Sequence, residues 1–436
     1  PSPADAKPPA PPAPADAATP PPPDPASALL PVLEVELGVP ANALHAGDLD
    51  GDGKLEALVL CSVGRGRYAT VLVAVDDDGR ELWRAPNAAR WSAPLVLPGS
   101  RPQVVFNQGQ EYRNHLAWVD GASGKTLRTA KAPGRRPVHP TRLPERNALI
   151  AVAQGIQGRD PHDGKAYPGG HRDPRSTLGL FLPEWRPLLA RGDVAPGRGM
   201  SGVHAWSFDA DGDGRPELLW AINRRFLLID MDSGRPRRIF PSEPVPGAQH
   251  QWAAVSPSGT AAVLTFASEA RPFRTRAICL ERGGVRWNRS YEGFTRANHP
   301  YAVQWQDEDR LLLQGSQGGF DSIAPGRALL VDGRTGEELK RVDSEGPLSP
   351  GPVLPSGAVV VGQRTGALAL YDRALRLRTS WQPSKETLAG PRWLLAGDER
   401  RLWCIRQGRR TLVALALRAS AEDSPHGPSL HRPRSG

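Results

Sequence analysis

The 436-residue chain contains few cysteines, methionines, lysines and aromatic residues. Its three cysteines, Cys61, Cys279 and Cys404, are far apart, so their spacing fits neither a disulfide framework nor a metal motif, and we expect buried free thiols. No apolar run approaches the roughly 20 residues that cross a bilayer as a helix. The sequence begins without an initiator Met or a signal-type segment, which predicts that a leader, anchor or further domain preceded it.

Basic residues outnumber acidic ones, 55 against 46, and 48 of the 55 are arginines. They are spread along the chain without any run of five, whereas nucleic-acid-binding domains concentrate their charge on one face or helix. We therefore expect no nucleic-acid partner. Two interpretations of the arginine excess stay open: the codon bias of a GC-rich bacterial genome, or a surface that meets an anionic partner.

The two ends of the chain differ in composition from its middle. Residues 1–31 hold 13 prolines and few apolar residues, which predicts an extended linker, and the polar segment 419–436 predicts a disordered tail. The whole chain has 46 Gly and 46 Pro, a density that long helical bundles do not tolerate.

Between the two ends one pattern recurs: an apolar run that ends in Asp, a tight turn with Gly, and a second short strand. Because the Asp side chain accepts turn hydrogen bonds and Gly supplies a positive φ, each copy predicts a hairpin. Two more short strands precede each hairpin, so the unit is four strands repeated every 40 to 55 residues. The copies lie at 71–85, 115–130, 225–240, 327–342 and 366–381, with weaker ones at 177–190 and 275–290.

This period predicts an all-β fold, an eight-bladed β-propeller of four-stranded antiparallel blades over residues 32–418. The last unit has only three strands, and the alternating segment 32–38 has no other partner, so we expect this N-terminal strand to close the ring. A pair of open sandwiches is the alternative. The units begin near His45, Ser92, His139, His204, His250, His299, Pro350 and Ala389.

Two segments, 47–58 and 208–219, place carboxylates at positions 1, 3, 5 and 9 of a Gly-containing loop. Oxygen ligands at this spacing suit Ca²⁺, and two structural calcium sites are predicted; acidic hairpins without metal are the alternative. The expected ligands of the first site are Asp48, Asp50, Asp52, Glu56 and the carbonyl of Lys54. Those of the second are Asp209, Asp211, Asp213, Glu217 and the carbonyl of Arg215.

These acidic loops resemble the FG-GAP (VCBS) repeats of integrin-like propellers. The hairpins, with an apolar run, Asp, x-x-Ser/Thr-Gly and often Trp, resemble the blades of the pyrroloquinoline-quinone-like (PQQ-like) propeller superfamily. Together the resemblances cover about residues 32–418. The quinone-using members carry adjacent cysteines in the cofactor site, and this chain has neither a Cys-Cys pair nor a CxxCH haem motif. The resemblance therefore implies a member without PQQ or haem.

Five histidines, His45, His139, His204, His250 and His299, fall near the start of the first strand of a unit. In propellers of this type that strand lines the central channel, so we expect a partial ring at one mouth; hydrogen bonds that brace each blade are the alternative. Polar side chains that follow the second strands, among them Gln108, Gln154 and Gln314, are predicted at the same mouth. They either bind a ligand beside Trp91, Trp206, Trp252 and Tyr301 or satisfy turn backbones.

The long loop 154–179 holds His162, Asp163, Tyr167, His171 and Asp173 without a discernible nucleophile–base spacing. The sequence thus predicts a non-catalytic, extracytoplasmic bacterial module that recognises a protein or glycan, with a membrane link only through a missing upstream anchor. A calcium-dependent polysaccharide lyase or hydrolase is one alternative, and a sensor domain of a larger receptor or kinase is another.

Overall fold

The structure is a computed structural model of the whole chain. It describes residues 28–64, 70–89, 93–109, 115–131, 135–143, 148–155, 177–181, 185–190, 205–222, 225–243, 245, 248–268, 274–292, 302–316, 325–344, 346, 348–363, 366–382, 393–398 and 400–418.

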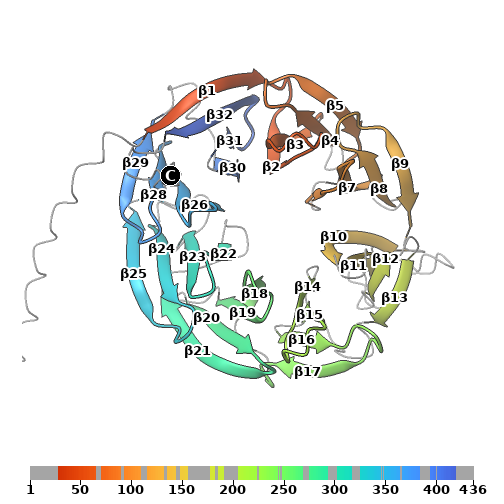
Figure 1. Cartoon of the computed structure of the whole chain (residues 1–436), viewed down its shortest axis with the longest axis vertical. Coiled ribbons are helices and arrows are strands. Elements are labelled where there is room, and N and C mark those ends of the chain that lie inside the picture. The colour runs from red at the N-terminus through yellow and green to blue at the C-terminus, as the bar shows by residue number, and fades with distance from the viewer. Residues whose placement is uncertain are drawn as a thin grey trace, which may run out of the picture.

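Within these residues every regular element is a strand, and the strands form eight four-stranded antiparallel sheets arranged in a ring (Figure 1). The all-β class and the four-stranded antiparallel blades agree with the sequence. In seven sheets the four strands follow one another in the chain, and the first of them lies nearest the centre of the ring (Figure 1).

The first three of these sheets are β2 (Ala41–Gly47), β3 (Glu56–Ser62), β4 (Thr70–Val75) and β5 (Glu81–Pro86); β6 (Leu95–Leu97), β7 (Gln103–Gln108), β8 (His115–Asp120) and β9 (Thr126–Ala130); β10 (Arg135–Leu143), β11 (Ala148–Gly155), β12 (Thr177–Phe181) and β13 (Trp185–Ala190). The next two are β14 (Ala205–Phe208), β15 (Glu217–Ile222), β16 (Arg225–Ile229) and β17 (Pro236–Phe240); β18 (Ala248–Val255), β19 (Ala261–Ser268), β20 (Arg274–Glu281) and β21 (Gly284–Glu292).

Two further sheets are β22 (Ala302–Trp305), β23 (Arg310–Ser316), β24 (Gly326–Asp332) and β25 (Glu338–Ser344); β26 (Leu348–Val353), β27 (Val359–Gln363), β28 (Leu368–Tyr371) and β29 (Leu377–Trp381). The remaining sheet joins the two ends of the chain. From the outside inward its strands are β1 (Ala28–Glu36), β32 (Thr411–Arg418), β31 (Leu402–Arg406) and β30 (Trp393–Gly397).

The N-terminal strand β1 pairs antiparallel with β32, so the prediction that an N-terminal strand completes the three-stranded last unit is confirmed. Its predicted start at Val32 is wrong, because β1 begins at Ala28. The expected strand began only after Pro31, but the missing N–H of this proline is tolerated on an edge strand, here beside a register shift. Leu29 is then buried in a cluster that this sheet shares with β27 and β28 of the neighbouring blade.

The recurring Asp-turn-Gly pattern is a hairpin, and the turns after β8 and β24 each receive a tryptophan from the preceding blade. In the turn after β8 the Asp120 carboxylate accepts the N–H of Ser123 at 2.9 Å, and Gly124 has a φ of 67°. Trp83 of β5 donates its indole N–H to the Gly121 carbonyl at 2.6 Å, and a methyl group on Gly124 would lie 2.5 Å from the Trp83 ring. Only glycine satisfies both the backbone angle and this close approach.

The apolar core lies between neighbouring blades. One cluster joins β3 and β4 to β31 and β32 and includes Cys61, Val73 and Trp403. The prediction of buried free thiols is confirmed, since Cys61, Cys279 and Cys404 are all unpaired and buried. Burial raises the pKa of the Cys61 and Cys279 thiols to about 12, so both are inert thiols at neutral pH. Among the described residues no helix is a candidate for crossing a membrane.

Candidate functional site

The first acidic loop connects the inner strand β2 to β3, and its own backbone folds around Asp48. The two carboxylate oxygens of Asp48 accept the N–H groups of Gly51 at 2.6 Å and Gly53 at 3.1 Å. Both glycines have positive φ, 87° and 83°, which curls the loop over the carboxylate. The loop therefore owes its shape to the Asp and Gly spacing that is visible in the sequence.

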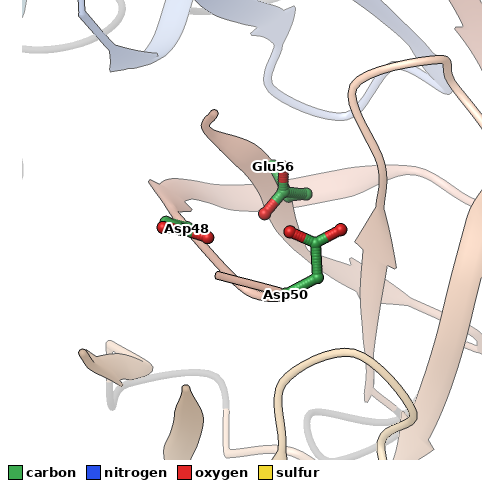
Figure 2. Close-up of side chains that lie close together, drawn as sticks. All are labelled: Asp48, Asp50 and Glu56. Atoms are coloured by element: carbon green, nitrogen blue, oxygen red, sulfur yellow. The ribbon is translucent and has the colours of Figure 1, made fainter. Parts of the chain in front are cut away.

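Three carboxylates of this loop converge (Figure 2). One oxygen from each of Asp48, Asp50 and Glu56 lies within 4.8 Å of the others, a grouping that could hold a metal ion. Glu56 is the first residue of β3 and is only 1% exposed, and its Oε2 accepts the Leu49 N–H at 2.6 Å. Burial, followed by the nearby carboxylates, raises the pKa of Glu56 to about 7. A bound cation would offset the free-energy cost of keeping Glu56 ionised beside the other carboxylates.

The fourth predicted carboxylate of the first loop lies outside this cluster. Asp52 accepts the Lys54 N–H at 2.8 Å and forms an ion pair with the Lys54 ammonium group at 3.1 Å. The same ammonium group contacts Asp77 of the next turn at 2.6 Å. The two bonds that Asp52 receives from Lys54 lower the pKa of the Asp52 carboxyl. Three of the four expected carboxylates therefore lie together, whereas the fourth, that of Asp52, is paired with Lys54.

The second acidic loop, between β14 and β15, repeats this frame. The Asp209 carboxylate accepts the N–H groups of Gly212 at 2.7 Å and Gly214 at 3.0 Å, and Glu217 Oε2 accepts the Ala210 N–H at 2.9 Å. Asp209, Asp211 and Glu217 form the corresponding cluster. Asp213 accepts the Arg215 N–H at 2.7 Å and lies outside that cluster, as Asp52 does in the first loop.

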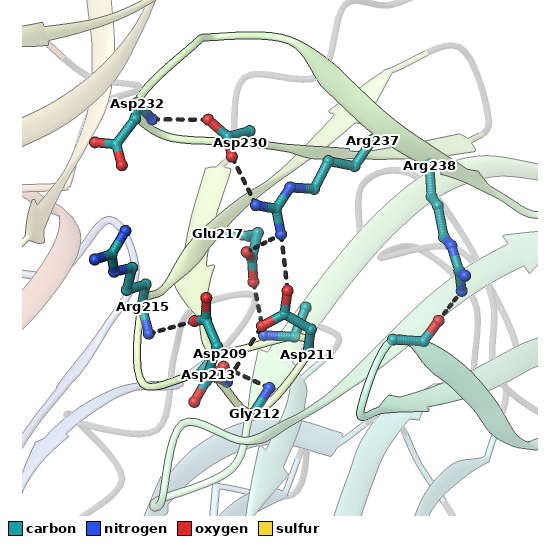
Figure 3. A network of polar contacts seen from close by, with 12 residues as sticks. Asp209, Asp211, Gly212, Asp213, Arg215, Glu217, Asp230, Asp232, Arg237 and Arg238 are labelled. Atoms are coloured by element: carbon teal, nitrogen blue, oxygen red, sulfur yellow. Dashed lines mark hydrogen bonds and ion pairs between the residues drawn. The ribbon is translucent and has the colours of Figure 1, made fainter.

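A guanidinium group enters the second cluster (Figure 3). Arg237 of β17 places Nη1 2.8 Å from Asp211 Oδ2 and 2.6 Å from Glu217 Oε1. Its Nη2 lies 2.7 Å from Asp230 Oδ2, in the turn between β16 and β17. Hydrogen bonds from Ser233 and then from Arg237 lower the pKa of Asp230 to about 2, whereas burial raises the pKa of Glu217. Arg237 could not be identified from the sequence, because it is one of three arginines in residues 235–238 and no motif distinguishes it from the others.

The predicted histidines lie on the inner strands, but the strand registers place them at different heights. His45 is two residues from the end of β2, His139 four from the end of β10, and His250 five from the end of β18. At about 3.3 Å per residue the spread is roughly 10 Å, so these three do not share one level. The prediction that His45 begins its strand is wrong, since β2 starts at Ala41. His204 and His299 lie outside the described residues.

His45 is partly buried and has no hydrogen-bond partner among the residues described, so bracing of its blade by a hydrogen bond is not seen. Burial lowers its pKa from 6.5 to about 4. The unfolded chain then binds a proton at higher pH than the folded chain does, so stability is lost as the pH falls from 6.5 towards 4.

Replacement of His45 by Gln removes this titrating group. Between pH 7 and pH 4 we expect the wild type to lose up to about 3 kcal/mol more unfolding free energy than His45→Gln, measured by urea denaturation at each pH. Parallel pH profiles of the two proteins would show that the imidazole is solvated like that of a free histidine.

The predicted glutamines have separate environments. Gln314 of β23 is fully buried; its Nε2 donates to the Gly351 carbonyl and its Oε1 accepts the Gly351 N–H, each at 3.4 Å. This amide joins two blades, so the prediction that it faces a ligand at the mouth is wrong. Gln108 is partly exposed and donates to the Pro86 carbonyl at 3.1 Å. Gln154 lies in β11, and its side chain is outside the described set.

Two of the predicted aromatic residues meet on neighbouring inner strands. Trp206 of β14 and Trp252 of β18 pack edge to face, with ring centroids 5.7 Å apart and an angle of 79°. Trp206 also contacts Phe226 at 5.9 Å, which anchors the pair to the core. Trp252 keeps 37% of its surface exposed. Trp91, Tyr301 and the acidic and histidine residues of loop 154–179 lie outside the described residues.

Comparison with known proteins supports the fold and leaves the family open. No protein-family model and no curated protein matches the sequence. Among solved structures, BamB from Moraxella catarrhalis is 13% identical, with 89% of this chain and 98% of that chain covered and a TM-score of 0.51. A quinohemoprotein alcohol dehydrogenase from Comamonas testosteroni is 11% identical, with 89% and 76% covered and a TM-score of 0.54.

The C-terminal WD40 domain of Sif2 is likewise 11% identical, with 89% of this chain and 98% of that chain covered and a TM-score of 0.57. At such identities the likeness shows the fold alone. That fold is the β-propeller, and membership of the PQQ-like superfamily stays an expectation from the sequence. The resemblance to FG-GAP (VCBS) repeats stays a prediction from the sequence.

Proposed function

We propose that this chain is a non-catalytic binding module that recognises a protein partner through the inner strands of its ring. The observation that carries the proposal is the pair Trp206–Trp252, in which one ring is anchored and the other is 37% exposed. Exposed tryptophans held by packing lose little entropy on binding and are frequent energetic centres of protein interfaces. A closed ring of sheets suits this role because it holds such a side chain in a fixed place.

Calcium is the second part of the proposal and concerns the first acidic loop. Asp48, Asp50 and Glu56 would supply the oxygen ligands, which are the type that Ca²⁺ prefers. Two oxygen atoms support this fit. Asp50 Oδ2 and Glu56 Oε1 form no hydrogen bond or ion pair with the described residues, so both are available to a metal ion. The ion would fix the turn between β2 and β3 and take no part in a reaction.

An extracytoplasmic location follows from the same proposal. Short acidic loops of this kind with few charged ligands bind calcium weakly, and extracellular modules work at the millimolar concentrations found outside cells. The buried cysteines are compatible with any redox compartment, because no pair of them forms a disulfide.

Replacement of Trp252 by Ala tests the binding role. On an array of peptides and an array of oligosaccharides, we expect Trp252→Ala to weaken peptide binding at least about tenfold, or 1.4 kcal/mol, with little change in melting temperature. The control is Leu339→Ala, which removes an aliphatic side chain that is 51% exposed on the outer strand β25. A glycan ligand, or equal binding by both variants, would contradict the proposed protein partner.

A further inference from the structure

We infer that Arg237 takes the place of a metal ion in the second acidic loop, so that the chain binds calcium at loop 48–56 and not at loop 209–217. For the first loop the inference rests on the calcium part of the proposed function. For the second it rests on contacts in the structure alone. It differs from the expectation of two calcium sites that the repeated motif creates.

The two loops have the same internal frame, so their difference comes from outside the motif. In both, the first Asp accepts two glycine N–H groups, and the Glu accepts the N–H of the residue after that Asp. In both, the second Asp accepts an N–H two residues further on, at 3.0 Å for Asp50 and 3.2 Å for Asp211. The same oxygen atoms are therefore left over in each loop after the backbone is satisfied.

In the second loop these remaining oxygens bind the guanidinium group. Asp211 Oδ2 and Glu217 Oε1 both contact Arg237 Nη1, which occupies the space between them (Figure 3). In the first loop the matching atoms, Asp50 Oδ2 and Glu56 Oε1, have no such cationic neighbour among the described residues. The guanidinium group thus shows where a cation is stable between these carboxylates. A side-chain cation occupies that position in the second loop but not in the first.

Strand register identifies the residue that corresponds to Arg237 in the first blade. Ala57, directly after Glu56, pairs with Val75, and Val75 pairs with Glu81, after which Leu82 is the extra residue of a register shift. In the other blade Leu218 pairs with Ile229, Ile229 pairs with Pro236, and the extra residue is Arg237. Leu82 therefore stands where Arg237 stands, and it is apolar.

Charge and geometry then decide between the two loops. Ca²⁺ requires six to eight oxygen ligands, and Arg237 already uses one oxygen of Asp211 and one of Glu217. A second cation beside the guanidinium group would be repelled, whereas Arg237 is held further by Asp230. Binding in the second loop would require the arginine to leave Asp211 and Glu217. In the first loop Lys54 points to Asp52 and Asp77, away from the cluster of three.

The experiment exchanges the two corresponding residues in the full chain and counts bound calcium. Metal-stripped wild type, Arg237→Leu, Leu82→Arg and the control Arg238→Leu are titrated with CaCl₂ by calorimetry, with native mass spectrometry for stoichiometry. We expect one ion on the wild type, two on Arg237→Leu, none on Leu82→Arg and one on the control. Arg238 is the adjacent residue and bonds to the Gly283 carbonyl instead of a carboxylate. Melting curves with and without EDTA should follow the counts.

Two ions on the wild type would overturn the inference and leave the calcium proposal for the first loop intact. No ion on the wild type and one on Arg237→Leu would refute the proposed site at 48–56 while the role of Arg237 stands. No ion on either protein would overturn both. If Arg237→Leu fails to fold, Arg237→Gln retains a polar side chain without the charge, and an unchanged count of one ion on that variant overturns the inference.

Discussion

A chain that lacks residues 1–38 will lose most of its stability, whereas a chain that lacks residues 1–27 will unfold at the same urea concentration as the full chain. The longer deletion removes β1 and the adjoining Leu37. Leu29 of β1 and Leu37 are 4% and 2% exposed and belong to two different clusters of the core. Burial of each leucine contributes about 1.5–3 kcal/mol. The shorter deletion removes a proline-rich segment with few apolar residues.

Strand β1 also covers neighbouring segments, so its removal lowers the unfolding free energy by more than the burial of the two leucines alone. Its Leu33 and Val35 lie against Gly79 in the turn between β4 and β5, and its removal leaves the whole of β32 as a free edge. We expect a loss of at least about 4 kcal/mol, a large part of the 5–15 kcal/mol typical of a domain. Urea unfolding monitored by near-UV circular dichroism measures it. Equal midpoints for the two truncated proteins would refute the closing role of β1.

Replacement of Trp403 by Ala will destabilise the ring where its last blade meets its first. Trp403 of β31 is fully buried and donates its indole N–H to the Leu55 carbonyl of the first acidic loop at 2.8 Å. Truncation of a buried tryptophan costs about 3–5 kcal/mol, and the Leu55 carbonyl also loses its donor. We expect a loss of about 4 kcal/mol or more.

Trp403→Phe separates packing from hydrogen bonding, because the ring is largely kept while the N–H is lost. That variant should lose about 1–2 kcal/mol, mainly through the missing hydrogen bond. Trp252→Ala is the matched control, since Trp252 is 37% exposed and its truncation should cost far less. Denaturant unfolding of all three proteins provides the comparison. A cost below about 1 kcal/mol for Trp403→Ala would show that the seam between the two blades tolerates a cavity.

The sequence by itself determined the features that depend on neighbouring residues. The hairpins were predictable because Asp120, Asp230 and Asp332 each bond to a backbone N–H group three residues away, and a glycine follows at a positive φ. The acidic loops were predictable for the same reason, since Asp48 and Asp209 each bond to glycines within five residues. Repetition of these local signals every 40 to 55 residues then indicated the propeller.

Tertiary structure decided whatever depends on contacts between distant segments. The start of β1 at Ala28 follows from its pairing with β32 at the other end of the chain, which local composition around Pro31 does not reveal. Gln314 is buried because the following blade brings Gly351 against it. The charge of the second acidic loop depends on Arg237, which reaches Glu217 only through the register of β15, β16 and β17. Two motifs with the same spacing therefore acquire different chemistry, because a strand two positions away supplies leucine to one and arginine to the other.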